Sequence, residues 1–280
     1  MTTGRSVLTA GPASRGRGRG RRAPLVLVAP AVLGLLFLLA PLLGLLIRAP
    51  WSGLPDLLLE RSVGQALRLS LLSATLALLL SLLIGVPLAW VLARLTFPGR
   101  RLLRALVTLP LVLPPVVGGV ALLYAFGQRG VLGPALDSVG ISLAFSTTGV
   151  VLAEAFVAMP FLIVVVEGAL AGADQRYEEA ASTLGASSWT TFRRVTLPLM
   201  GPSVAAGSVL CFARALGEFG ATITFAGNLP GTTQTMPLAV YIALESEPEA
   251  AVALALVLLA VSIAILLVLR ERWLRPGARP

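Results

Sequence analysis

Six long apolar runs constrain what this chain can fold into more than any other feature. They are separated by polar segments and lie at about residues 24–47, 67–92, 105–126, 149–171, 201–225 and 250–269. A run of about 20 apolar residues is long enough for a helix to cross the hydrocarbon core of a membrane. A helix also satisfies its own backbone hydrogen bonds, as a bilayer requires. The sequence therefore predicts an all-α integral membrane protein with six transmembrane helices.

The arginines predict the orientation of these helices. All 22 basic residues are arginine, and 17 of them lie before the first run or after the second, fourth and sixth runs. The segments on the other side hold three. Because positively charged loops stay in the cytoplasm, we expect both termini to be cytoplasmic. Residues 1–23, rich in arginine and glycine, are expected to form a disordered cytoplasmic tail, and residues 271–280 a second one.

The absence of certain residue types excludes whole classes of chemistry. The chain has no lysine, no histidine and one cysteine, Cys211. A Walker-type phosphate-binding loop needs its lysine, so this chain is not expected to be an ATPase. Histidine-based catalysis, zinc sites and internal disulfides are excluded in the same way. We therefore expect a non-enzymatic membrane protein with no metal or cofactor of its own.

The third run contains several residues that disrupt helices. Pro110, Pro114 and Pro115 are followed by Gly118 and Gly119. Within a membrane bundle, neighbouring helices can satisfy the backbone groups that such residues free, and broken helices commonly line a transport path. A kink needed only for packing explains the same residues, and the sequence leaves both readings open.

Apart from Arg68 at the edge of the second run, four charged residues lie inside apolar runs, where a charge is costly and is a functional candidate by default. Arg214 and Glu218 are four residues apart, so they share a helix face and can neutralise each other. They form either a pair that fixes helix packing or a site where Arg214 offers positive potential to an anion. Glu167 lies near the inner edge of the fourth run, and Glu154 is expected to face an outer vestibule.

The polar segment 172–198 is predicted to form two short helices joined by a turn at Gly185. Ser187 or Ser188 can cap the second helix. Trp189, Phe192 and Val195 recur at i, i+3 and i+6. They therefore lie on one side of that helix, which indicates a surface for docking another protein.

The spacing within this segment resembles a known motif. Glu-Ala-Ala, three residues, Gly, nine residues, an aliphatic residue, one residue and Leu-Pro is similar to the cytoplasmic loop of binding-protein-dependent ABC importer permeases. The resemblance implies a type I importer-like bundle in the bacterial inner membrane. It implies that the following residues couple the chain to an ATPase: Glu179, Ala180, Ala181, Gly185, Trp189, Phe192, Val195, Leu197 and Pro198.

The same resemblance implies partners. These are a second copy of the chain, two cytoplasmic ATPase subunits that bind ATP and Mg²⁺, and a periplasmic or lipid-anchored binding protein. Nucleic acid is not among them.

Residues 212–222 and 225–241 resemble the permeases of molybdate importers. Sulfate permeases share the Arg-Ala-x-Gly-Glu core, whereas the stretch Thr-Gln-Thr-Met-Pro-Leu at 233–238 favours molybdate, with tungstate as a companion substrate. A sulfate or thiosulfate permease is the alternative, and an ion-coupled secondary anion transporter is a more distant one. The candidate path residues are Pro114, Pro115, Gly118, Gly119, Arg214 and Glu218.

Overall fold

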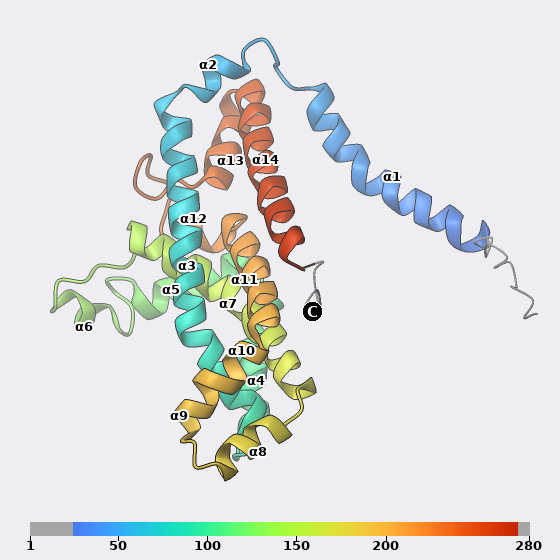
Figure 1. The fold of residues 1–280 in the computed structure, drawn as a ribbon. Coiled ribbons are helices and arrows are strands. Elements are labelled where there is room, and N and C mark those ends of the chain that lie inside the picture. Colours follow the sequence, from blue (N-terminus) through green and yellow to red (C-terminus); the bar gives the residue numbers. More distant parts are fainter. Residues whose placement is uncertain (1–24, 274–280) are drawn as a thin grey trace, which may run out of the picture. The chain divides into compact units, whose positions relative to one another are not determined.

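The computed structural model describes residues 25–273, and every regular element in this part of the chain is a helix (Figure 1). The expected tail 1–23 and residues 274–280 of the second expected tail lie outside the described residues. Residues 271–273 continue the last helix. The main helices are α1 (Leu25–Ile47), α3 (Arg61–Arg94), α4 (Arg100–Thr108), α5 (Pro115–Phe126), α7 (Thr147–Gly172), α8 (Arg176–Thr183), α11 (Gly201–Leu216), α12 (Gly220–Phe225), α13 (Met236–Ser246) and α14 (Pro248–Trp273). Short helices α2 (Leu54–Leu58), η1 (Leu109–Leu111), α6 (Gly133–Asp137), α9 (Ser188–Thr191), η2 (Phe192–Thr196) and α10 (Leu197–Leu199) connect them.

The described part of the chain divides into two compact units, one that ends at Ile47 and one that begins at Arg48. In the first unit, α1 is apolar along its whole length and contains Pro30 and Pro41. Its 22 residues from Val26 to Ile47 are enough to cross a membrane. A helix that is apolar on every side is typical of a membrane span.

Helix α7 is the centre of the second unit. Its N-terminus is capped by Ser146, whose Oγ accepts a hydrogen bond from the N–H of Gly149 at 3.1 Å. Small residues such as Ala155 and Ala158 let α3 and α11 approach α7 closely, as is usual between membrane helices. Gly207 of α11 meets Leu162 of α7 so closely that an added Cβ would lie 2.8 Å from its Cδ1. The core of the unit therefore lies between α3, α7 and α11.

The third expected span, 105–126, is broken into two helices. The stretch Arg100–Leu111 and helix α5 meet at an angle of 116°. Pro114 has an extended backbone, with φ −54° and ψ 130°. Pro115 lacks an N–H and starts α5, and a residue that precedes a proline is disfavoured in helical conformation. The break is therefore a sharp change of direction, so of the two alternatives that the prolines and glycines left open the structure has a broken helix and not a slight kink.

The fifth expected span, 201–225, is also interrupted. Helix α11 ends at Leu216, and a separate helix, α12, follows at Gly220. Before α11, the helical stretch Ser188–Leu199 bends by 73° into it. The single helix expected over 201–225 is thus replaced by two helices, α11 and α12, and α11 forms a bent pair with the stretch Ser188–Leu199 that precedes it. By length and composition, four helices of the described chain can span a membrane, or six if each bent pair counts as one span.

Helix α13 lies between the fifth and sixth apolar runs, in a segment for which no helix was predicted. It packs beside α14, to which it is joined within two residues (Figure 1). The N–H of Met236, in its first turn, donates to Oγ of Ser70 at 2.7 Å, and Met236 is fully buried. A buried serine of α3 therefore satisfies one of the free donors at the start of this helix.

Candidate functional site

Helix α8 carries the Glu-Ala-Ala motif and ends in a turn that requires glycine. The N–H of Gly185 donates to the carbonyl of Ser182 at 2.9 Å, and the N–H of Ala186 to that of Ala181 at 3.0 Å. These two bonds form a Schellman motif, in which the residue after the helix adopts a left-handed conformation. Gly185 has φ +82°, as the motif requires. Glu179 and Ala180 are exposed on α8, in the position expected of a docking surface.

The second helix of the segment begins as predicted and contains an irregular turn. Oγ of Ser187 accepts a hydrogen bond from the N–H of Thr190 at 3.3 Å. The helix then widens into a π-helical turn over Phe192–Thr196 before α10. Leu197 and Pro198 are exposed. The helical stretch that contains them ends at Leu199, and the chain bends there into α11. A π-helical turn is a frequent feature of functional sites.

The two aromatic residues of this helix have different environments. Phe192 packs edge-on against Trp90 of α3, with ring centroids 6.1 Å apart. Trp189 stacks on Phe192 at 5.8 Å and remains 68% exposed. With Pro87 and Val91, these rings line an apolar hollow. Phe192 therefore belongs to the protein's own packing, and of the three expected docking residues Trp189 is the most available, since Val195 is half-buried.

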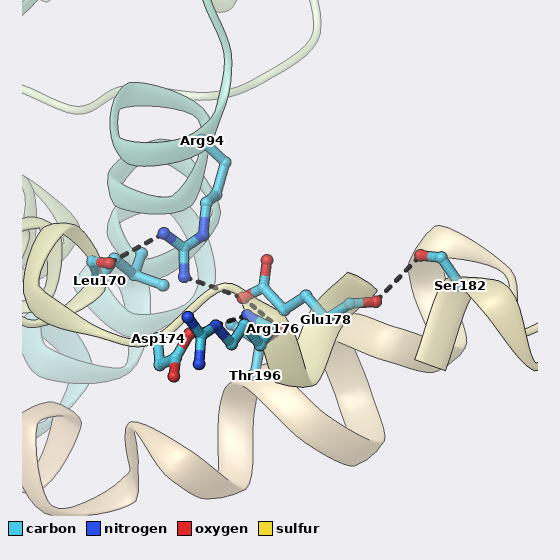
Figure 2. Close-up of polar contacts among 7 residues, drawn as sticks. All are labelled: Arg94, Leu170, Asp174, Arg176, Glu178, Ser182 and Thr196. Atoms are coloured by element: carbon cyan, nitrogen blue, oxygen red, sulfur yellow. Dashed lines mark hydrogen bonds and ion pairs between the residues drawn. The ribbon is translucent and has the colours of Figure 1, made fainter. Parts of the chain in front are cut away.

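Arg94, the last residue of α3, ties the motif helix to the bundle (Figure 2). Its Nη1 donates to the carbonyl of Leu170 in α7 at 2.9 Å, and its Nη2 to Oε1 of Glu178 in α8 at 3.0 Å. The hydroxyl of Thr196 donates to the same Oε1 at 3.0 Å. One arginine and one glutamate thus join α3, α7, α8 and the π-helical turn.

Two further arginines fix the helix ends beside this cluster. Nε of Arg104 in α4 donates to Oε1 of Glu167 in α7 at 2.7 Å. Nε of Arg100 donates to the carbonyl of Leu92 at 2.7 Å, which satisfies one of the free carbonyls at the end of α3. The arginines that the sequence analysis assigned to topology therefore also hold these helices together.

The candidate path residues come together where α5 meets α12. An added Cβ on Gly119 would lie 2.8 Å from the carbonyl oxygen of Ala221, and one on Gly220 would lie 2.9 Å from Cβ of Pro115. Gly118 is buried against Phe156 of α7. The glycines of the third apolar run thus allow two short helices, distant in sequence, to approach at backbone distance.

Arg214 and Glu218 form the predicted ion pair, although α11 ends at Leu216 and Glu218 lies just beyond it and not on the same helix face. Nη2 of Arg214 lies 2.6 Å from Oε2 of Glu218, whose side chain is 1% exposed. Oε1 of Glu218 accepts a hydrogen bond from the N–H of Ala221 at 2.7 Å, at the start of α12. Glu218 therefore neutralises Arg214 and also stabilises the helix that contacts Gly119. The remaining path candidate, Pro114, lies at the preceding break and is exposed.

Glu154 does not face an outer vestibule as expected. Its side chain is buried, and Oε1 accepts a hydrogen bond from Oγ of Ser73 in α3 at 2.8 Å. Small polar partners of this kind are how membrane helices accommodate an ionisable side chain. Elsewhere in the described chain, no three histidine, cysteine or acidic side chains are placed to hold a metal ion.

Comparison with known proteins identifies the family. Residues 85–279 match the family model described as "Binding-protein-dependent transport system inner membrane component". The chain belongs to this family. It is therefore a permease subunit of an ABC importer and a multi-pass protein of the inner membrane, as the motif spacing indicated.

Individual members of the family and one solved transporter are similar to this chain over most of its length. The molybdenum transport system permease protein ModB of Mycobacterium tuberculosis is 52% identical over 213 residues, covering 76% of this chain and 81% of the relative. The sulfate transport system permease protein CysW of Synechococcus elongatus is 44% identical over 189 residues, covering 68% and 66%. The solved bacterial alginate ABC transporter, in complex with an alginate-bound periplasmic protein, matches with a TM-score of 0.73 at 20% identity over 88% and 92% of the chains. The last likeness concerns the permease fold alone.

The sequence analysis missed Arg94 and Glu178 as members of the site. Arg94 was one of the arginines that set topology, and Glu178 stands directly before the motif's own glutamate. The two are 84 residues apart, so nothing local pairs them. The positions of the two charges gave a signal. Arg94 ends α3 and Glu178 lies in the first turn of α8, and the helix dipole favours a cation at a C-terminus and an anion at an N-terminus.

Proposed function

We propose that this permease carries molybdate into the cell, and tungstate with it, as the membrane subunit of an ATP-driven importer. The observation that carries the proposal is the 52% identity to a molybdenum permease over three quarters of the chain. The sulfate permease is less similar, at 44%. Sulfate or thiosulfate is therefore the second candidate substrate.

The importer needs partners that supply energy and specificity. We infer a homodimer of this chain, two cytoplasmic ATPase subunits that hold ATP and Mg²⁺, and a periplasmic or lipid-anchored binding protein. The exposed Glu179 and Ala180 on α8 and the 68% exposed Trp189 support an ATPase contact at this segment. The absence of lysine and histidine supports placing the hydrolytic chemistry in another subunit.

The arrangement in the membrane follows from the helices and the arginines together. Four long helices and two bent pairs support six spans, and the distribution of arginines supports cytoplasmic termini. In this arrangement α8 and Arg94 lie at the cytoplasmic face, where an ATPase is accessible.

The path itself is suited to passage rather than tight binding. A dianion needs a polar route through hydrocarbon, and Arg214 is the basic residue placed in the fifth apolar run. Because Glu218 neutralises it at 2.6 Å, Arg214 offers little net charge to a resting anion. Selection between molybdate and sulfate therefore falls mainly to the binding protein, and the permease can release its substrate readily.

Uptake into proteoliposomes tests the proposal. The vesicles contain this chain, its ATPase and its binding protein, and radiolabelled molybdate is offered with ATP on the ATPase side or on the opposite side. We expect uptake only with ATP on the ATPase side, blocked by excess tungstate and little affected by excess sulfate. Equal competition by sulfate would transfer the substrate assignment to sulfate and leave the ATP-driven mechanism intact.

The same vesicles separate the importer from an ion-coupled transporter. Such a transporter would use Glu154, Arg214 and Glu218 as a relay and would run on a proton or sodium gradient. Uptake driven by a gradient without ATP would contradict the proposed function.

A further inference from the structure

The helix that carries the docking motif uses neighbouring residues for different contacts. In an α-helix, successive residues are separated by about 100° around the axis. Glu179 of α8 is exposed, whereas the side chain of Glu178 is only 21% exposed and points to Arg94 (Figure 2). The motif glutamate is therefore available to a partner, while the residue before it holds the helix to the bundle.

The contact of Arg94 with Leu170 and Glu178 is directional, and its charges suit the helix ends at which they lie. The guanidinium of Arg94 is planar and carries donors in a fixed fork, so it can reach two acceptors at once. It bonds the carbonyl of Leu170 at the C-terminal end of α7, where the helix dipole favours a cation. Glu178 lies in the first turn of α8, where the dipole favours an anion. Charge-assisted hydrogen bonds of this kind are stronger than neutral ones.

Partial burial makes this contact more persistent than a surface ion pair. The side chain of Arg94 is 8% exposed, and Thr196, which also donates to Glu178, is 3% exposed. Exposed ion pairs contribute little because water and salt screen them. Here the carboxylate is shared by Arg94 and Thr196, so α8 and the π-helical turn are fixed to one point at the ends of α3 and α7.

We propose that Arg94 and Glu178 are positioning residues that transmit movement of the docking segment to α3 and α7. The inference rests on the proposed function, because the movement is the one that an ATPase would impose. A displacement of α8 is passed directly to the last turn of α3 and the last turn of α7. Without the pair, α8 docks but tilts independently of these helices, so ATP is hydrolysed with less transport.

Three variants and a control test this in the complete transporter. Glu178→Gln keeps the shape and removes the charge, Arg94→Gln removes the guanidinium, and Arg94→Lys keeps the charge without the fork. Arg101→Gln is the matched control, since Arg101 is exposed in α4 and no hydrogen bond or ion pair is found for it among the described residues. The readouts are the number of molybdate ions imported per ATP hydrolysed, co-purification of the ATPase, and amide hydrogen exchange of residues 176–183.

For Glu178→Gln and Arg94→Gln we expect normal co-purification and a fall of about tenfold in molybdate imported per ATP, a typical size for coupling between sites. Exchange in 176–183 should rise, while that in 220–225 should stay unchanged. The ratio of molybdate imported to ATP hydrolysed should be intermediate in Arg94→Lys, between the Gln variants and the unaltered chain. In Arg101→Gln this ratio should equal that of the unaltered chain.

An unchanged ratio of molybdate to ATP in both Gln variants would overturn the proposal. Loss of ATPase co-purification would overturn it too, because the pair would then serve docking and not transmission. Failure of the unaltered chain to import molybdate with ATP would instead overturn the proposed function. The exchange data would still report whether the pair restrains α8, so the two failures are distinguishable.

Discussion

Two contacts between segments distant in sequence are held by different physics. Where α5 meets α12, the helices approach at backbone distance through Gly119 and Gly220, and shape decides the contact. Where α8 meets α3 and α7, a shared carboxylate and a guanidinium make the contact across longer side chains. A close-packed contact tolerates almost no change in volume, whereas a charge-assisted hydrogen-bonded contact depends on the charge and on the donor geometry of its side chains. Shape therefore holds the α5–α12 contact, and charge with directional hydrogen bonds holds the contact of α8 with α3 and α7.

The largest effect is expected from adding one methyl group at the α5–α12 contact. In Gly119→Ala, the new Cβ would lie 2.8 Å from the carbonyl oxygen of Ala221, where neither backbone can yield cheaply. Overpacking of this kind costs about 1–3 kcal/mol, so the thermal midpoint in detergent should fall by several degrees.

Gly168→Ala in α7 is the matched control, because an added Cβ there would meet no atom within 4 Å. It should be neutral or slightly stabilising, as alanine favours helix over glycine. Equal midpoints for the two variants would mean that shape does not hold the α5–α12 contact.

A smaller and more local effect is expected at the turn after α8. Gly185 has φ +82°, while an added Cβ would meet no atom within 4 Å. Gly185→Val should therefore strain only the backbone, by about 1–2 kcal/mol, and Gly185→Asn less, because asparagine tolerates this conformation. We expect both variants to insert and fold, with molybdate uptake lost in the valine variant and partly kept in the asparagine variant. Normal uptake by the valine variant would remove the turn from the coupling segment.

The smallest effect is expected from salt, which should weaken the contact held by charge and leave the contact held by shape unchanged. Raising ionic strength from 0.1 to 1 M shortens the screening length from about 10 to about 3 Å. Hydrogen exchange in residues 176–183 should rise modestly, by about twofold, because a partly buried pair is screened only in part. Exchange in 220–225 should not change. In Glu178→Gln, exchange in 176–183 should no longer depend on salt. If this variant responds to salt as the unaltered chain does, charges other than the Arg94–Glu178 pair cause the response.

The sequence predicted those parts of the structure that depend on local composition. Helices α3, α7 and α14 lie where the apolar runs indicated helices, because apolar length is sufficient to specify such elements. The Arg214–Glu218 pair and the Ser187 cap were predictable because the partners are only three or four residues apart, although Glu218 lies just beyond the end of α11. The turn at Gly185 followed from its position between two helical patterns.

The remaining features depend on contacts that composition does not record. The prolines of the run 105–126 indicated a disruption but not its angle, and the break within 201–225 was not predicted, because hydrophobicity is unchanged where a helix is interrupted. Glu154 could not be placed, since its partner Ser73 lies 81 residues earlier. Helix α13 was missed because its first turn is supported by Ser70 of α3, 166 residues away from Met236.

The anchor of α8 also limits how this protein can be recombined with others. A chimaera that exchanges only segment 172–198 would bring a new docking surface while retaining the original end of α3. The grafted helix would then meet Arg94 with whatever residue replaces Glu178. Arg94 and Glu178 are 84 residues apart in the sequence. A chimaera with a new ATPase preference therefore needs the end of α3 as well as the docking segment from the same donor protein.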